Sequence, residues 1–271
     1  MNPVLRLSFL LLAIILFSQC EKEVTFIDAS PSFLNALIQL GIDTDEDGKI
    51  SLSEARAVSK LEIINEPVSD LTGIQSFSNL DTLICRGSQL TSIDVSKNTG
   101  LLYLRCSSNP LTKLDVSNNT ALKYLRCGVT QLTDLDVSGN AALTTLHCSH
   151  CDLANLDVSM NPELVNLYCG SNQISLLDVS SNVALTTLDC SYCNLSNLDV
   201  SKNPELVNLY CGGNQLSMLD VSSNTVLQEL YINDMPTLYK VCVDVRPFPL
   251  TNVYVYSAGS PNVYYATDCS K

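Results

Sequence analysis

The sequence is poor in the residues that loosen regular structure and in positive charge. Of 271 residues only 11 are Gly and 10 are Pro, while 46% are apolar. Such a chain can bury a large core and is neither low-complexity nor disordered. It has 15 Lys and Arg against 28 Asp and Glu, a net charge of −13. Nucleic acid and anionic membrane surfaces would repel it, so neither is expected as its main partner.

The N-terminus lacks a hydrophobic run long enough to span a bilayer. Its apolar stretch, residues 7–17, follows one basic residue, Arg6, and is about half the roughly 20 residues of a membrane helix. We interpret residues 1–19 as an export signal rather than a membrane helix. The residues before Cys20 resemble a lipobox, although Phe17 and Gln19 depart from it. The resemblance implies a lipid on Cys20, an outer-membrane or cell-surface location, and membrane contact through the lipid alone.

Repetition is what the sequence has in abundance. Seven cysteines from Cys85 to Cys211 recur every 21 residues. Around each stands the frame Leu-x-x-Leu-x-Cys-x-x-(Asn, Ser, Thr or Cys)-x-Leu/Ile-x-x-Leu/Ile-Asp-Val-Ser-x-Asn-x-x. A fixed period of roughly 20 to 30 residues with this leucine spacing is typical of a solenoid. The frame resembles a leucine-rich repeat, and the three-residue spacing in residues 71–80 is similar to internalin-type repeats.

The predicted fold class is therefore a leucine-rich-repeat solenoid of parallel β coils with little helix. Six residues of each frame should point inward: two Leu, Cys, the Leu/Ile pair and Val. One coil cannot fold alone, so stacking and two end caps must stabilise it. We divide the chain into a signal peptide (1–19), a tether (20–29), an EF-hand-like helical cap (30–60), the solenoid (61–226) and a β-rich C-terminal cap (227–271).

The N-terminal cap contains a candidate calcium loop. Ser30 and Pro31 are typical of the start of a short helix, which Gly41 should end. Residues 43–54 then match every position of an EF-hand loop. This resemblance implies calcium ligands at Asp43, Asp45, Asp47, the Lys49 carbonyl, Ser51 and Glu54, with Gly48 at the sharp turn and Ile50 packed inward. No second loop is found, so a structural role is favoured over sensing; the alternative is an acidic capped loop.

Cysteine chemistry is disfavoured. Cys148/Cys151 and Cys190/Cys193 form two CxxC pairs, but residues 143–226 are a two-coil unit copied once, which places the pairs about 9.6 Å apart. That is too far for one zinc ion. Cys151 and Cys193 also stand where other coils have Asn, a turn-capping position in this family. The seven-cysteine ladder is predicted to be buried free thiol, and Cys242 with Cys269 is the best disulfide candidate.

A second ladder repeats one Asp per coil from Asp94 to Asp220. Stacked like charges about 5 Å apart cost roughly 0.8 kcal/mol per pair in water. We predict that these carboxylates bind turn backbone, and bound cations are the alternative.

Variation is concentrated on the expected concave face. Tyr and Arg are the residue types that anchor interfaces, and we predict that this face binds a protein or glycan; the alternative is a merely solvated surface. The candidate residues are Arg86, Tyr103, Arg105, Tyr124, Arg126, His147, Tyr168, Asp189, Tyr192, Tyr210 and Tyr231.

Taken together, these residues predict a monomeric surface binding protein with structural calcium and no catalytic residues. No nucleophile, base and orienting group fall together in the repeat frame. A structural or adhesive envelope component without a single ligand, and a CxxC-based metal or redox protein, are the alternatives.

Overall fold

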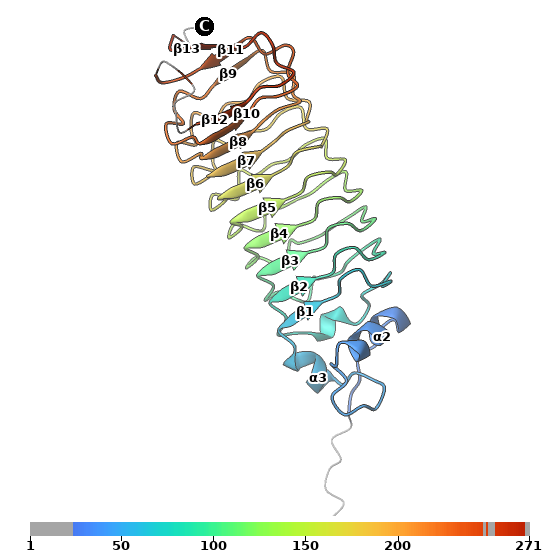
Figure 1. The fold of residues 1–271 in the computed structure, drawn as a ribbon. Coiled ribbons are helices and arrows are strands. Elements are labelled where there is room, and N and C mark those ends of the chain that lie inside the picture. Colours follow the sequence, from blue (N-terminus) through green and yellow to red (C-terminus); the bar gives the residue numbers. More distant parts are fainter. Residues whose placement is uncertain (1–23, 246–247, 249–252, 269–271) are drawn as a thin grey trace, which may run out of the picture.

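The computed structural model describes residues 24–245, 248 and 253–268 of the chain. These residues form a parallel β solenoid of stacked coils with very little helix (Figure 1), which confirms the predicted fold class. The proposed signal peptide, Cys20 and Cys269 lie outside the described residues.

Each coil buries the residues that the repeat frame predicts. In the coil that begins at residue 101, Leu101, Leu104, Cys106, Leu111, Leu114 and Val116 all point inward, and none exposes more than 8% of its surface. The same six positions are buried in the following coils, so one apolar column runs along the stack. Hydrophobic burial between neighbours therefore holds the coils together.

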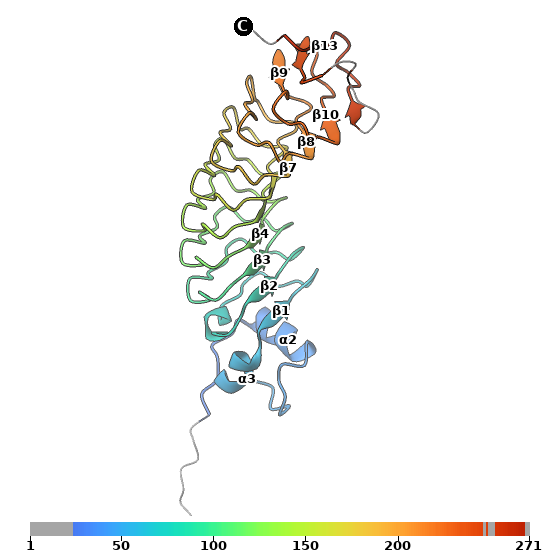
Figure 2. The same ribbon diagram turned by 90° about the vertical axis from the view of Figure 1, so that its left-hand side faces the viewer.

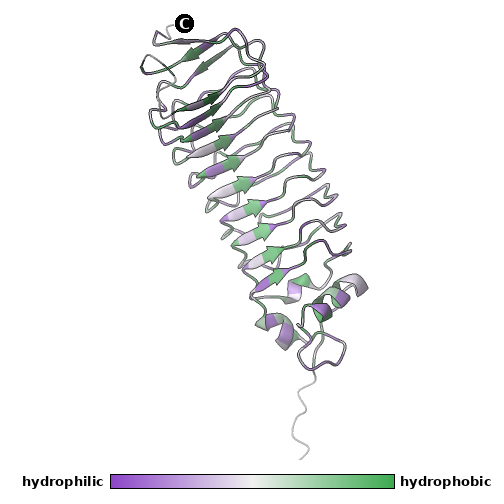
Figure 3. Ribbon diagram, viewed as in Figure 1, coloured by the Kyte–Doolittle hydropathy of each residue, from purple (hydrophilic) through white to green (hydrophobic). Residues whose placement is uncertain are grey.

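Ten short strands form one parallel sheet along the stack. In sheet order they are β1 (Lys60–Glu62), β2 (Thr82–Ile84), β3 (Tyr103–Arg105), β4 (Tyr124–Arg126), β5 (Thr145–His147), β6 (Asn166–Tyr168), β7 (Thr187–Asp189), β8 (Asn208–Tyr210), β10 (Glu229–Tyr231) and β12 (Tyr254–Tyr256). The sheet lies on the inner side of a curved stack (Figure 2), and we call it the concave sheet. Its strands carry hydrophobic and hydrophilic residues side by side (Figure 3), because the middle residue of each strand faces the core.

The opposite, convex side is built from turns rather than from a full second sheet. In the described residues the strands on this side are β9 (Met218–Asp220), β11 (Lys240–Cys242) and β13 (Tyr264–Ala266), which form a three-stranded parallel sheet. Elsewhere on this side the structure has isolated bridges such as Asp94 to Asp115.

Side-chain hydrogen bonds replace the missing convex strands. One fully or almost fully buried Asn per coil, from Asn98 to Asn224, donates its amide to two carbonyls of the preceding coil or turn. Asn161, for example, donates to Val137 and Asn140 at 2.9 Å each. Each Asp of the Asp94–Asp220 ladder accepts the backbone N–H of the Ser two residues later, at 2.9 to 3.0 Å. The predicted bonding of the Asp ladder to turn backbone is thus confirmed.

The N-terminal cap begins with helix α2 (Pro31–Gln39), which buries Phe33 and Leu37. Ser30 occupies the cap position, but its side chain does not cap the helix. Its hydroxyl instead donates to the Asp70 carbonyl at 2.9 Å. The expected cap is absent because this hydroxyl ties the helix to the first coil.

Helix α3 spans Leu52–Ala57, and a capping box between Ser51 and Glu54 fixes its start. Lys60 begins β1 because it pairs with Thr82 of β2. The first coil also contains a 3₁₀ turn, η1 (Ile74–Ser76). Within the described residues, no helix is long and apolar enough to cross a membrane.

The C-terminal region extends the stack although the sequence frame ends at residue 226. Strands β10 and β12 join the concave sheet in parallel, while β11 and β13 continue the convex one. β12 and β13 are edge strands, as their alternation predicts. Cys242 is buried and disulfide-bonded; its pairing with Cys269 remains a prediction because Cys269 is not among the described residues.

Candidate binding surface and candidate metal loop

Two columns of side chains stand on the solvent face of the concave sheet. Strand pairing aligns the first residues of the strands into one column and the last residues into another. The first column is Lys60, Thr82, Tyr103, Tyr124, Thr145, Asn166, Thr187, Asn208, Glu229 and Tyr254. The second is Glu62, Ile84, Arg105, Arg126, His147, Tyr168, Asp189, Tyr210, Tyr231 and Tyr256. Nine of the eleven predicted surface residues fall in these columns.

The arginines of the second column are neighbours without an acidic partner. Arg105 pairs in register with Arg126, and the strand spacing places them about 4.8 Å apart. Among the described residues an ion pair links Lys60 and Glu62, at 2.8 Å, and neither arginine shares it. The Nε atoms of both arginines are buried and find no hydrogen-bond acceptor there. Two positive charges are thus held side by side and uncompensated.

Beside the arginines, two tyrosines form a rigid pair. The rings of Tyr103 and Tyr124 are stacked, with centroids 4.2 Å apart and an interplanar angle of 4°. Burial and the Tyr124 hydroxyl raise the pKa of Tyr103. A stacked pair of this kind loses little side-chain entropy when a partner docks.

His147 continues the second column after Arg126. Burial and the charge of Arg126 lower the pKa of His147, so the imidazole is neutral near pH 7. Its Nδ1 is buried and finds no hydrogen-bond partner among the described residues. Cys148 points to the opposite side, into the core, so His147 and Cys148 do not converge on one site.

Tyrosines dominate the C-terminal half of the concave sheet. Tyr231 lies at the centre, with its ring 4.9 Å from Tyr210, 5.8 Å from Tyr254 and 5.6 Å from Tyr256. The Tyr210 hydroxyl donates to Glu229. Burial, together with this hydrogen bond, raises the pKa of Tyr210. Tyr254 and Tyr256 were missed as surface candidates. Their alternation predicted a strand, but only its register with β10 places them on this face.

The two remaining candidates lie just beyond the strands. Arg86 follows β2 and is half-buried. Tyr192 is 53% exposed and has a positive φ of 51°. Its hydroxyl donates to Asp234 at 2.6 Å and accepts from Asn233 at 3.1 Å. Its ring also lies so close to Gly213 that a Cβ there would be 2.3 Å away. Tyr192 therefore spans three coils along the rim of the concave sheet.

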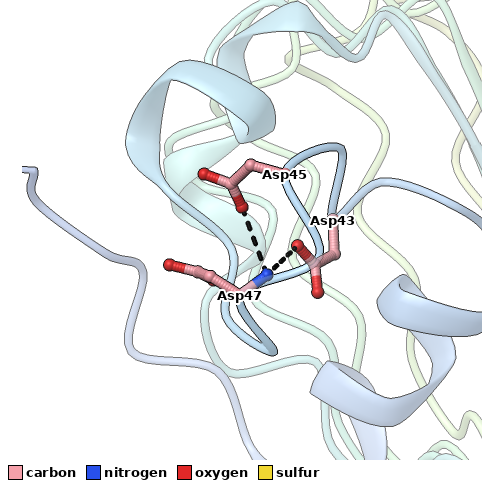
Figure 4. Close-up of side chains that lie close together, drawn as sticks. All are labelled: Asp43, Asp45 and Asp47. Atoms are coloured by element: carbon pink, nitrogen blue, oxygen red, sulfur yellow. Dashed lines mark hydrogen bonds between the residues drawn. The ribbon is translucent and has the colours of Figure 1, made fainter.

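The N-terminal loop brings three predicted calcium ligands together. Oxygen atoms of Asp43, Asp45 and Asp47 lie within 4.8 Å of one another and could hold a metal ion (Figure 4). The backbone N–H of Asp47 donates to Asp43 at 3.2 Å and to Asp45 at 3.4 Å. Gly48 has a φ of 78°, as the sharp turn requires. Desolvation is the main cause that raises the pKa of Asp45, and the charge of Asp47 raises it further.

Glu54 lies outside that cluster. Its carboxylate accepts the Ser51 N–H at 2.8 Å and the Thr44 N–H at 2.6 Å. These bonds, that of Ser51 first, lower the pKa of Glu54 to about 2. In this arrangement Glu54 serves the capping box of α3 and is not part of the Asp cluster.

The loop is braced by the segment that precedes the cap. Ile50 is buried, as predicted, and its carbonyl accepts the Ile27 N–H at 2.9 Å. Leu52 donates to the Thr25 carbonyl at 2.8 Å, and Phe26 forms an antiparallel bridge with Ser51. Residues 25–27 thus supply the strand that pairs with the loop.

The cysteine ladder serves to pack the core. Its seven thiols are fully buried and free, and burial raises the pKa of Cys85 to about 12. Cys151 and Cys193 occupy the turn-capping position. There the Cys193 thiol donates to the Cys169 carbonyl at 3.5 Å, just as the amide of Asn109, at the same position of another coil, donates to the Cys85 carbonyl at 2.7 Å. Buried protonated thiols are poor nucleophiles and metal ligands.

Neither family models nor curated proteins match this sequence. Solved structures do. The functional domain of InlJ from Listeria monocytogenes, which includes a cysteine ladder, is 30% identical over 88% of this chain and 61% of that one, with a TM-score of 0.53. Internalin C2 from the same organism is 18% identical over 92% and 100%, with a TM-score of 0.59. The LRIM1/APL1C complex is 22% identical over 71% and 40%, with a TM-score of 0.58.

This chain spans less than two thirds of the length of two of these three neighbours. Internalin C2 and the LRIM1/APL1C complex are below 25% identity, so their likeness shows the fold alone. The stacked parallel strands, the leucine positions and the structural likeness agree on that fold. By its fold, the chain is a leucine-rich-repeat protein.

Proposed function

We propose that this chain is an exported surface protein that binds a protein or glycan partner on its concave sheet. The observation that carries the proposal is the pair of aligned columns, rich in Tyr and Arg, on an otherwise repetitive scaffold. Leucine-rich-repeat neighbours support an interaction scaffold, and one of them was solved as a complex.

The contrast between fixed and varied positions supports binding rather than catalysis. The Leu, Cys, Val, Asn and Asp of each coil already serve packing or turn backbone. The residues of the two columns are not set by the repeat frame, although Asp189 also accepts the Ser191 N–H at 3.0 Å. Varied residues on a rigid scaffold are where recognition resides.

The proposal includes a lipid on Cys20 that holds the chain at an outer membrane or cell surface. It also includes calcium at Asp43, Asp45, Asp47, the Lys49 carbonyl, Ser51 and Glu54. The convergence of the three aspartates and the turn at Gly48 fit the ion, and Glu54 would add a fourth carboxylate from the start of α3. When bound, the ion would neutralise the clustered carboxylates and stiffen the cap.

Position-specific photo-crosslinking tests the binding face. A photoreactive residue replaces Tyr168 at the centre of the second column or, as a matched control, Leu176, which is 71% exposed and outside the concave sheet. On intact cells we expect a discrete crosslinked species at position 168 that is missing at 176. The same species at both positions, or none at 168, contradicts binding by the concave sheet and favours a structural role.

Calorimetry tests calcium separately. Wild type should release or absorb heat on titration with calcium, with a dissociation constant on the order of 10⁻⁴ to 10⁻³ M for an extracellular site. Asp43→Ala should abolish this heat, whereas Asp134→Ala, which removes an exposed carboxylate outside the loop, should keep it. Equal heats for wild type and Asp43→Ala rule out this site.

A further inference from the structure

The concave sheet is chemically divided along its length. Strands β3 and β4 present Arg105 and Arg126, while β8, β10 and β12 present clustered tyrosines. The chain as a whole carries a net charge of −13. A paired positive charge on such a chain is a local exception, and its surroundings indicate what it can bind.

No carboxylate of the concave columns is near enough to neutralise the arginines. The in-register neighbours of the pair are Ile84 and His147. Glu62 is two strands from Arg105, about 10 Å at the usual strand spacing, and is bonded to Lys60. Asp189 is three strands from Arg126, about 14 Å away. Both distances exceed the roughly 8 Å over which exposed charges act at physiological ionic strength.

The two guanidinium groups stand next to each other in register. Their Nε atoms are buried, so an anion from solvent would meet the terminal nitrogens, which are not among the buried atoms without a partner. Guanidinium groups bind carboxylates with two parallel hydrogen bonds, so a neighbouring pair suits a ligand with closely spaced carboxylates.

The adjacent tyrosines favour a polypeptide over a sugar chain. Tyr103 and Tyr124 are stacked on each other at 4.2 Å, so each ring covers one face of the other and fewer ring faces are free for a ligand. A sugar stacks on free ring faces, whereas a peptide uses hydroxyl and guanidinium donors together. Tyr and Arg are also the residues that dominate protein interfaces.

We infer that β3 and β4 bind an acidic polypeptide segment, with its carboxylates on Arg105 and Arg126 and its backbone or side chains against the Tyr103–Tyr124 pair. The inference rests on the proposed function and names the partner chemistry of the N-terminal half of the same face. Because the arginine pair is remote from the tyrosine cluster around Tyr231, the two halves contact different parts of one partner.

The test uses a fluorescent Glu-rich peptide and the full chain, measured by fluorescence anisotropy. Arg105→Gln with Arg126→Gln should weaken binding at least roughly tenfold. The matched control, Lys113→Gln with Lys202→Gln, removes the same charge from exposed positions outside the concave sheet. It should stay within about twofold, and wild-type binding should fall as salt rises. Circular dichroism checks that all variants are folded.

Three outcomes overturn the inference. The peptide does not bind wild type; the two double variants lose equal affinity, which indicates unspecific charge; or a polygalacturonate oligomer binds through the arginines and the peptide does not, which assigns the patch to an acidic glycan. The double variant Arg105→Lys with Arg126→Lys keeps both positive charges but lacks the paired N–H donors of guanidinium. It should bind the peptide with intermediate affinity. The crosslinking result at Tyr168 is independent of each of these outcomes, so the inference and the proposed function can fail separately.

Discussion

The two sides of the solenoid use their polar side chains differently. On the convex side the same Asn and Asp recur in each coil, and their side chains bond to backbone. On the concave sheet the residues of the two columns are not set by the repeat frame, and several of them pack against each other, as the stacked rings of Tyr103 and Tyr124 do. The difference teaches that stability resides in the repeated residues and recognition in the varied ones. The following changes would break or sharpen that contrast, from the largest expected effect to the smallest.

Removing one convex amide should have the largest effect. Asn161→Ala removes a donor from two carbonyls, those of Val137 and Asn140, and leaves each with a single backbone donor. We expect a loss of about 2 kcal/mol in the free energy of unfolding, measured by denaturant titration. Asn166→Ala on the concave sheet, where the amide makes one long bond of 3.4 Å, should cost under about 0.5 kcal/mol. Similar losses for both would erase the contrast.

Changing a ladder cysteine should destabilise through packing alone. Cys169→Ser places a hydroxyl in an apolar site and should cost about 1 to 2 kcal/mol, whereas Cys169→Ala should cost about 1 kcal/mol. Both are measured by denaturant titration. Burial raises the pKa of the Cys169 thiol, so the ladder should also resist alkylation at pH 8 until the chain unfolds. Rapid alkylation of the native chain would contradict a packing role.

Relieving backbone strain at the rim should stabilise the fold. Val129 has a φ of 59°, a region in which a β-branched residue is strained. Val129→Asn should raise the free energy of unfolding by about 1 kcal/mol, seen as a higher melting temperature. Val183→Asn changes an equally exposed valine at 56% against 54%, with ordinary φ, and should be neutral. A gain in both variants would point to surface polarity instead of strain.

The smallest effect on stability is expected when the pH is lowered. The Ser180 hydroxyl and backbone N–H lower the pKa of Asp178 from its ordinary 3.8. Because the native pKa is below the unfolded one, the ionised carboxylate adds stability above pH 3.8, and this is lost as pH falls through the native value. Asp178→Asn should therefore unfold with a weaker pH dependence below pH 4 than wild type. An unchanged acid profile would show that this bond is not linked to folding.

Periodicity alone predicted most of the scaffold. The leucines, cysteines and valines of the frame face inward because a repeat of fixed length gives each copy the same neighbours. The ends could not be predicted in this way. Ser30 bonds to Asp70 and Lys60 pairs with Thr82, contacts between segments whose local patterns favour a cap and a helix.

The candidate surface was predictable in position but not in chemistry. Alternation around each second leucine placed Arg105 and Arg126 on one face. The absence of an acidic neighbour in the described residues depends on which strands are adjacent and on how side chains bury one another. Tyr254 and Tyr256 were not predicted as surface residues because the frame ends before them, and only strand pairing sets their register.

The convex asparagines also bear on how such a chain can change length. Each amide reaches back to acceptors 21 and 24 residues earlier, so every added coil brings its own donor and finds its acceptors already in place. Copying residues 143–184 into residues 185–226 therefore creates no interface that the chain did not have before. Each copied coil adds one residue to each concave column, so gene duplication lengthens the recognition surface without any redesign of the scaffold beneath it.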